Sequence, residues 1–225
     1  MKYLIANFKS HKSREEMEKW LTDFEQQVFH SPVKIILCPP MPSLMFISNR
    51  LLDRSKHPVT FLGVQDISSF PAGAYTGAVS AWNLAGFMVN YALVGHSERR
   101  RYFHETHQEV ANKVAQCLEN SITPIVCVDA DYIQAQANAI NPEYLAKCVV
   151  AYEPLAAIGS GFNQPIEEVE VAVAKIKQAF GQIPVIYGGS VNANNAADYL
   201  KVTDGVLVGT DALDPVAFTN IIFLA

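Results

Sequence analysis

One glutamate stands where a base for proton transfer at carbon is expected. Glu153 follows the apolar run 148–152 and precedes Pro154 and a segment with glycines at positions 159 and 161. A carboxylate at the end of a strand can act as a general base, and a glycine-containing loop beside it can close over the reacting atoms. Since the intermediate of such a reaction must be kept away from water, this pattern indicates an enzyme that moves a proton to and from carbon.

Other polar side chains also come directly after apolar runs. Lys9 follows the run 3–8, and Asn7, two residues before it, is expected on the same side of that strand. The two side chains can bind the oxygens of a small anion. His96 comes after the run 91–94. A neutral imidazole there can polarise a carbonyl, and N–H groups at a helix start favour the neutral form.

Short glycine turns follow three of the apolar runs. They lie at residues 159–161, 188–190 and 209–210. Backbone N–H groups in such turns bind phosphate without a cationic side chain, although a single short glycine turn is by default only a tight bend.

Two sets of charged or titratable residues have less specific interpretations. We interpret Arg99 and Arg100 as supports for the neighbouring Glu98. His104 and His107 have the spacing of metal ligands, but no third ligand is evident in the sequence. We therefore predict that both histidines are exposed and that the protein holds no metal.

The composition limits the class of protein. Half of the 225 residues are hydrophobic and 17% are charged, which allows a large core and argues against disorder. The net charge of −5 disfavours a nucleic-acid-binding surface. The apolar stretch 3–6 is too short for a signal peptide or a membrane span, and the four cysteines show no CxxC pair. We predict a cytoplasmic protein with reduced cysteines and no membrane or nucleic-acid partner.

Eight short apolar runs recur along the chain, most of them separated by helix-like stretches. Continuous apolar runs are typical of parallel strands covered on both faces. The alternation predicts an α/β fold, a closed parallel (β/α)8 barrel that forms one domain over residues 1–225. An open doubly wound sheet is the alternative, but the first run lacks a GxGxxG turn and an open sheet would scatter the polar residues. The runs are 3–8, 33–38, 59–64, 91–94, 122–128, 148–152, 184–187 and 205–208.

Three stretches between the runs have clear helical spacing. Residues 13–29 carry apolar side chains at that spacing, and Ser13 with Glu16 predicts a capping box. Residues 106–119 follow the same pattern. A third helix is predicted over 167–180, with Pro165 near its first turn and Gly181 at its end.

With these motifs identified, the chain resembles the triosephosphate isomerase family from residue 5 to about residue 222. Several independent motifs on the expected strands carry the resemblance, in the family's order. They are Ala6-Asn7-Phe8-Lys9, residues 95–100, Ala151-Tyr152-Glu153-Pro154, residues 157–161 and residues 187–191.

The resemblance implies an aldose-ketose isomerase of glycolysis and gluconeogenesis. Such an enzyme interconverts dihydroxyacetone phosphate and D-glyceraldehyde 3-phosphate through an enediolate. On this basis Glu153 is the base, and His96 and Asn7 polarise the substrate oxygens. Lys9 supplies positive charge, and Glu98 orients the Asn7–Lys9 end of the site. No metal or organic cofactor is implied.

The resemblance also implies how the substrate is held and covered. A lid loop over residues 154–164 closes on the substrate and excludes water. The backbone groups that hold the phosphate belong to Gly159, Ser190, Gly209 and Thr210. The lid includes Pro154, Ile158, Ser160 and Gly161.

Residues 65–80 resemble the loop that this family inserts into a neighbouring subunit. Tyr75 and Thr76 belong to its Ala74-Tyr75-Thr76-Gly77 sequence, and Thr76 would brace the partner's catalytic groups. The resemblance therefore implies a homodimer. The alternative is a long surface loop without a partner.

Two departures from the family pattern lie near the fifth helix and the lid. The segment 127–151 is shorter than usual, and Asp129-Ala130 replaces the family's Gly-Glu after the cysteine. We expect an abbreviated helix within 130–146, broken at Asn141-Pro142. The first lid hinge reads Leu155-Ala156 in place of an aliphatic residue and a tryptophan. In the family that tryptophan meets the lost glutamate, so the paired change indicates a rebuilt hinge.

A third departure lies at the last phosphate turn, where Thr210-Asp211 replaces a smaller, uncharged pair. An inward-pointing Asp211 would repel phosphate, whereas an outward-pointing one would cap a short following helix. We expect the capping role, with substrate binding weakened somewhat.

Two other functions remain as alternatives. One is an impaired homologue that binds sugar phosphates as a sensor or scaffold, and the other is a different phosphate-handling barrel enzyme. The joint presence of Asn7, Lys9, His96, Glu98 and Glu153 argues against the first, because binding alone does not require a base.

Overall fold

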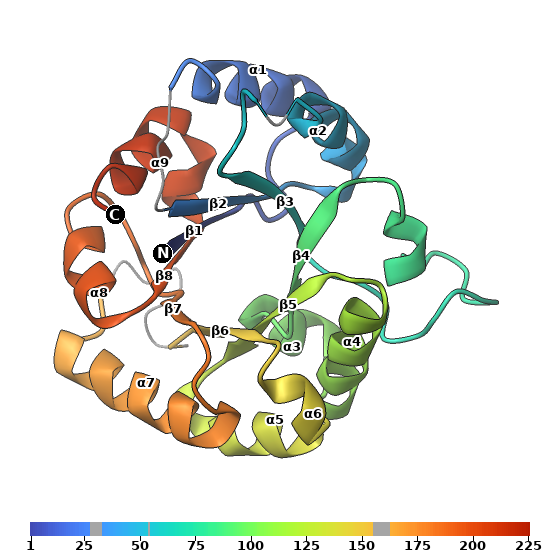
Figure 1. The fold of residues 1–225 in the computed structure, drawn as a ribbon, viewed down its shortest axis with the longest axis vertical. Coiled ribbons are helices and arrows are strands. Elements are labelled where there is room, and N and C mark those ends of the chain that lie inside the picture. Colours follow the sequence, from blue (N-terminus) through green and yellow to red (C-terminus); the bar gives the residue numbers. More distant parts are fainter. Residues whose placement is uncertain (28–32, 54, 155–162) are drawn as a thin grey trace.

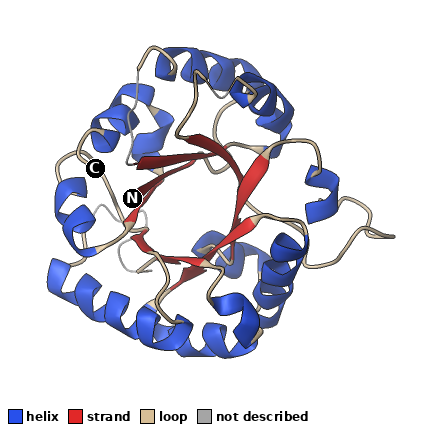
Figure 2. Ribbon diagram, viewed as in Figure 1, coloured by secondary structure: helices blue, strands red, loops and turns tan. Residues whose placement is uncertain are grey.

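The computed structural model describes residues 1–27, 33–53, 55–154 and 163–225, and it confirms the predicted closed parallel barrel. Each strand pairs with the next in sequence order, and β8 (Gly205–Val208) closes on β1 (Lys2–Asn7). Figure 1 shows the strands as an inner ring with helices outside it, and Figure 2 separates the two layers by colour. An open doubly wound sheet is therefore excluded.

The apolar runs match the strands to within two residues at either end. The largest difference is in β4, which begins at Val89 and so before the predicted run 91–94. The remaining strands are β2 (Val33–Cys38), β3 (Thr60–Val64), β4 (Val89–Val94), β5 (Thr123–Val128), β6 (Val149–Tyr152) and β7 (Val185–Tyr187).

The helices cover the outside of this barrel (Figure 2). Short 3-10 turns lie at Met41–Ser43, Ala81–Leu84, Ala130–Tyr132 and Thr210–Leu213. The α-helices are α1 (Arg14–Phe24), α2 (Leu44–Leu51), α3 (Ser97–Phe103), α4 (His107–Glu119), α5 (Ile133–Ala139), α6 (Pro142–Leu145), α7 (Ile166–Phe180), α8 (Ala196–Val202) and α9 (Pro215–Ile222). No helix in the described ranges is both long and apolar enough to span a membrane.

The strand alternation divides the core in two. Ile5 belongs to a cluster of inward-facing side chains that fills the barrel, whereas Leu4 and Ala6 belong to the cluster between the barrel and the helices. Successive residues of a strand point to opposite faces, so both faces of each strand must be apolar. This requirement explains why the strands read as continuous apolar runs.

Capping residues and glycines mark the helix ends as predicted, except that α1 is shorter than predicted. Ser13 accepts a hydrogen bond from the Glu16 amide while the Glu16 carboxylate accepts one from the Ser13 amide, which confirms the capping box. α1 ends at Phe24, so the predicted helix 13–29 is wrong beyond that point, and its residues 28 and 29 lie outside the described residues. α7 stops before Gly181, whose φ of +89° favours glycine.

The expectation of a shortened fifth helix is confirmed. Only the seven residues of α5 and the four of α6 lie between β5 and β6 as α-helix. The break is at Asn141-Pro142, where the Asn141 side chain accepts a hydrogen bond from the Glu143 amide and starts α6.

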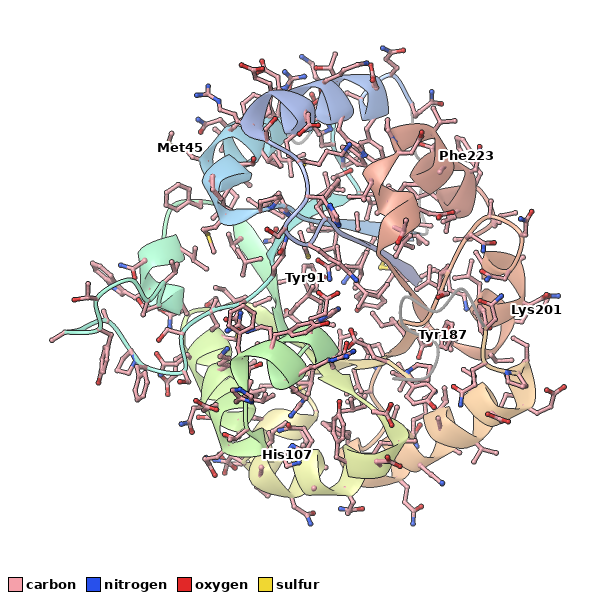
Figure 3. The ribbon with its side chains drawn as sticks, turned by 180° about the vertical axis from the view of Figure 1, so that it is seen from behind. Met45, Tyr91, His107, Tyr187, Lys201 and Phe223 are labelled. Carbon is pink, nitrogen blue, oxygen red and sulfur yellow. The ribbon has the colours of Figure 1, made fainter. Side chains whose placement is uncertain are left out.

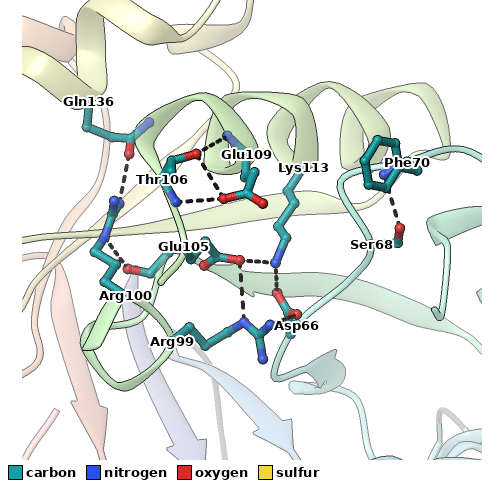
Figure 4. A network of polar contacts seen from close by, with 11 residues as sticks. Asp66, Ser68, Phe70, Arg99, Arg100, Glu105, Thr106, Glu109, Lys113 and Gln136 are labelled. Atoms are coloured by element: carbon teal, nitrogen blue, oxygen red, sulfur yellow. Dashed lines mark hydrogen bonds and ion pairs between the residues drawn. The ribbon is translucent and has the colours of Figure 1, made fainter. Parts of the chain in front are cut away.

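A buried glutamine ties this short helix to the helix that follows β4. Gln136 of α5 has no exposed surface, and its side-chain oxygen lies 2.7 Å from Nη2 of Arg100 in α3. Its amide nitrogen donates to the carbonyl of His107. Figure 4 shows the contact between Gln136 and Arg100. The side chain therefore joins α5 to α3 and α4.

We predict that Gln136→Ala lowers the free energy of unfolding by about 2–4 kcal/mol, because it leaves a cavity and removes the acceptor of a charged hydrogen bond. Urea denaturation measures the loss. Gln134→Ala on the exposed face of the same helix is the control, with an expected change within about 0.5 kcal/mol. Equal effects of the two variants would contradict this role of Gln136.

Candidate active site

The carboxyl ends of the strands bring the five predicted catalytic residues to one rim of the barrel. Asn7 ends β1 with Lys9 two residues beyond, His96 and Glu98 follow β4, and Glu153 follows β6 directly. They form a chain of contacts from Lys9 to Glu98, from the Glu98 amide to His96, and from His96 to Glu153. Residues far apart in the sequence thus meet in one place.

The carboxylate of Glu153 is fully buried, and the part of the chain that the structure describes holds only one of its two oxygens. Oε2 accepts a hydrogen bond from the backbone N–H of Ser97 at 2.9 Å. Oε1 lies 3.3 Å from Nε2 of His96 and has no hydrogen-bond partner among the described residues. Burial, and then the charge and hydrogen bond of Glu153, raise the pKa of the neighbouring Cys127 thiol. Since most buried polar atoms have a hydrogen-bond partner, Oε1 is unusual in that it can still accept one.

The hydrogen bonds of His96 indicate its tautomer. Nδ1 accepts from the backbone N–H of Glu98 at 3.2 Å, while it lies 3.7 Å from Oε2 of the same residue. The shorter contact to a backbone donor leaves no place for a proton on Nδ1. The ring is therefore neutral with its proton on Nε2, and that nitrogen faces Glu153.

Gly95 makes the turn that places His96 and α3. Its φ of +73° lies in the left-handed region, and an added Cβ would stand 2.6 Å from Nη2 of Arg100 and 2.9 Å from Val110. Both the backbone conformation and the lack of space require glycine here.

Lys9 is held at the rim by both its side chain and its backbone. Nζ lies 2.6 Å from Oε1 of Glu98. Its φ of +49° is a strained conformation for a residue with a side chain. Asn7 Oδ1 accepts from the Lys9 amide at 3.0 Å, and Gln65 Nε2 donates to the carbonyls of Lys9 and Cys38 at 2.8 and 3.0 Å. These bonds hold the strained backbone in place.

The prediction that Lys9 lies on the same side of the strand as Asn7 is wrong. β1 ends at Asn7, so the alternation of a strand does not extend to Lys9. Gln65 is a site residue that the sequence analysis missed, because nothing in its local sequence distinguishes it from any other residue after a strand.

The glycine pair after β7 is required by its neighbours. A Cβ on Gly188 would lie 3.0 Å from Cγ of Glu153, and one on Gly189 would lie 2.2 Å from the hydroxyl of Tyr187. Neither residue has a positive φ. The pair therefore leaves room for the Glu153 side chain and for the Tyr187 ring.

A pocket of about 340 Å³ opens on this rim, between the ends of β1, β4, β7 and β8. Three of the four predicted phosphate-binding residues line it, namely Ser190, Gly209 and Thr210, together with Asn7, Lys9 and His96. Glu153 does not line it. The carboxylate instead lies against His96 and Gly188, which do line the pocket.

Asp211 also lines this pocket, and the prediction that it caps the following helix is wrong. The cap of α9 is Asp214, whose carboxylate accepts from the amides of Val216 and Ala217. Burial, and then the charge of Asp214, raise the pKa of Asp211. A carboxylate with an elevated pKa thus stands beside the predicted phosphate turn.

Behind the site lies a network of charges that the sequence did not reveal (Figure 4). Arg99 contacts Asp66 at 2.9 Å and Glu105 at 3.4 Å, and the buried Lys113 contacts both carboxylates. Burial raises the pKa of Asp66, and Lys113 opposes that shift. Through Asp66, which follows Gln65, the network joins the segment after β3 to α3 and α4.

The interpretation of two arginines and one histidine is corrected by these contacts. Arg99 and Arg100 do not support Glu98, since Arg100 donates to the carbonyls of Gly95 and Cys127. His104 is exposed as predicted, whereas His107 is half-buried, with Nδ1 3.2 Å from Gln136. Among the described residues, no group of three or more histidine, cysteine or acidic side chains could hold a metal ion.

Other predicted residues lie away from this pocket or outside the described ranges. Pro154 is buried directly after Glu153. Tyr75 and Thr76 are exposed on a loop that projects from the barrel between β3 and β4 (Figure 1). The lid and phosphate residues Ile158, Gly159, Ser160 and Gly161, and the hinge at Leu155-Ala156, lie outside the described residues.

The known proteins that this chain resembles are triosephosphate isomerases. The family model described as triosephosphate isomerase matches residues 2–225. The chain is 35% identical to a triosephosphate isomerase of Symbiobacterium thermophilum, covering 97% of this chain and 94% of the relative. It is 33% identical to one of Thermus thermophilus, covering 99% and 98%. A triosephosphate isomerase of Herminiimonas arsenicoxydans is 35% identical, covering 98% of each chain.

Proposed function

The chain belongs to the triosephosphate isomerase family, and from that premise we propose which of its residues carry the reaction. The enzyme interconverts dihydroxyacetone phosphate and D-glyceraldehyde 3-phosphate, an aldose-ketose isomerisation of glycolysis. Glu153 is the base that removes a proton from one carbon and returns it to the next. The closeness of its carboxylate to Nε2 of His96, 3.3 Å, is the observation that carries this proposal.

Glu153 turns from its resting position to reach the substrate. Its carboxylate is held by the Ser97 amide and does not line the pocket. The single backbone hydrogen bond contributes only about 0.5–1.5 kcal/mol net, or somewhat more because the acceptor is charged. A substrate in the pocket therefore competes readily for the carboxylate.

The electrophilic groups stabilise the charge that the proton transfer creates. The Nε2–H of His96 and the side chain of Asn7 donate to the substrate oxygens as the enediolate forms, and Lys9 adds positive charge. Glu98 holds Lys9 through the 2.6 Å contact between their side chains. The site needs no redox group, because the reaction only relocates protons.

Phosphate binding and water exclusion complete the proposal. The backbone N–H groups of Ser190, Gly209 and Thr210, which line the pocket, bind the phosphate, with Gly159 as a further donor. Residues 154–164 act as a lid that covers the enediolate, since water there promotes loss of phosphate. We place this reaction in the cytoplasm.

The assembly that fits these features is a homodimer through the loop 65–80. Phe70 and Tyr75 are 49% and 43% exposed and stack on one another with ring centroids 4.6 Å apart. A second pocket, of about 290 Å³, reaches Lys9 and Glu98 from the side of Phe103. Thr76 of a partner loop in that pocket would brace the Lys9–Glu98 pair.

We predict that Glu153→Asp lowers kcat on the order of 10²-fold, because a base withdrawn by about one ångström approaches the substrate carbon badly. A coupled assay with glyceraldehyde 3-phosphate measures the rate, and an active unaltered enzyme in that assay excludes the sensor and scaffold alternative. Glu143→Asp on exposed α6 is the control and should keep full activity. Unchanged turnover in Glu153→Asp would assign the base elsewhere.

A second prediction concerns Asp211. Asp211→Asn should lower KM by about two- to fivefold, because a carboxylate near a phosphate at a solvated rim costs about 1 kcal/mol or less. Since the pKa of Asp211 is raised, the carboxyl takes up its proton at a higher pH than an exposed one. The difference in KM should therefore shrink as the pH falls. Asp198→Asn on α8 makes the same charge change away from the pocket and should leave KM unaltered.

The third prediction is the oligomeric state. Light scattering at micromolar concentration should give twice the chain mass of 24.8 kDa. Tyr75→Asp should shift the protein to the single-chain mass, since it places a charge at the centre of the proposed contact. Val171→Asp, at an exposed apolar position of α7, is the control and should stay dimeric. A single-chain mass for the unaltered protein would refute the assembly.

A further inference from the structure

Two stacked tyrosines hold the residue at the C-terminal end of the proposed lid. Tyr187 ends β7 and Tyr199 lies in α8, with ring centroids 3.9 Å apart and planes that differ by 19°. The backbone N–H of Gln164 donates to the Tyr187 hydroxyl at 3.4 Å, and the Tyr199 hydroxyl donates to the Gln164 carbonyl at 2.8 Å. Figure 3 shows Tyr187 on the same side of the molecule as Lys201 of α8.

The Tyr199 hydroxyl donates a hydrogen bond to the Gln164 carbonyl, which accepts none from the helix that follows. Gln164 precedes Pro165, and the first carbonyl that accepts hydrogen bonds within α7 is that of Pro165, from the amides of Glu168 and Val169. The Gln164 carbonyl lies outside this ladder, so the Tyr199 hydroxyl is its donor. Tyr199 is only 2% exposed, and a buried hydroxyl is normally placed to make such a bond.

The same residue is linked to the strand that carries the base. Burial raises the pKa of Tyr152, and a hydrogen bond from the side chain of Gln164 opposes that shift. Tyr152 is the residue before Glu153. Gly189 leaves the space that the Tyr187 hydroxyl occupies, since a Cβ there would stand 2.2 Å away. Side chains from β6, β7 and α8 therefore converge on Gln164.

We propose that Tyr199 is a positioning residue for the isomerisation, whose hydroxyl fixes the backbone of Gln164 and thereby the C-terminal anchor of the segment 154–164. This inference rests on the proposed role of that segment as a lid. An anchor already in place reduces the conformational freedom that must be lost when the segment covers the substrate. Tyr199 touches no substrate and acts only through Gln164.

Loss of this anchor has a chemical signature. In an exposed enediolate the bond between carbon and the phosphate oxygen breaks, and inorganic phosphate leaves with the bonding electrons. The remaining enol takes a proton on its terminal carbon, gives up the proton of its hydroxyl group to water and becomes a three-carbon dicarbonyl compound. A lid with a loosened anchor should allow this elimination more often per isomerisation, which a general loss of folded protein would not do.

Tyr199→Phe keeps the ring and its stacking and removes only the hydroxyl. We expect kcat to fall about three- to tenfold, the effect of one net hydrogen bond, with KM changed less than twofold. Inorganic phosphate released per molecule isomerised should rise at least twofold. Tyr144→Phe is the control: its half-buried ring lies on α6, and its hydroxyl makes no hydrogen bond to the described residues.

Tyr199→Leu, which also removes the ring, separates the hydrogen bond from the stacking. It should lower the melting temperature more than Tyr199→Phe and match it in kcat. If Tyr199→Phe keeps the kcat and the phosphate release of the unaltered enzyme, the inference is overturned, even where Tyr199→Leu is impaired. An unaltered enzyme without isomerase activity would instead refute the proposed function.

Discussion

Two backbone N–H groups in the first turn of α3 organise the whole site. The Ser97 amide holds the Glu153 carboxylate, and the Glu98 amide holds Nδ1 of His96. Neither amide has a partner within its own helix, because the first N–H groups of a helix never do. The same turn thus positions the proposed base and sets the tautomer of the proposed electrophile. Gly95 makes this possible, since its left-handed backbone brings the start of α3 directly over the end of β4.

Two features keep the site residues close together: glycines leave space beside them, and hydrogen bonds fix the backbone of Lys9. Gly188 leaves room for Glu153 and Gly189 for Tyr187. The strained backbone of Lys9 is kept in place by Asn7 and Gln65. Strain of this kind, of order 1–3 kcal/mol per residue, persists only where neighbours over-determine the conformation. The rim of the barrel provides such neighbours, because eight strand ends meet there.

The charged network of Asp66, Arg99, Glu105 and Lys113 fixes the start of the projecting loop 65–80. Arg99 follows Glu98 directly, and its contacts with Asp66 and Glu105 link α3 to the start of the loop after β3. Lys113, which lies in α4, forms ion pairs with the same two carboxylates. Buried charges of this kind require mutual pairing because desolvation is costly. The geometry of the rim and the position of the loop are therefore coupled.

The sequence by itself determined the barrel, the order of its strands, the cap of α1 and the five polar residues at the rim. These depend on signals that are local, such as continuous apolar runs, Ser13 with Glu16, and short motifs after strands. The break at Asn141-Pro142 is equally local, because a proline with a preceding asparagine ends one helix and starts another.

Only the tertiary structure decided which distant groups support that rim. Gln65, Gln136 and Tyr199 each act through side-chain hydrogen bonds to residues tens of positions away, and no periodicity marks such residues. The same limit explains the errors: Lys9 lies beyond its strand, and Asp211 faces the pocket while Asp214 caps α9. A side chain's direction past the end of an element is set by packing against other elements, which local sequence does not encode.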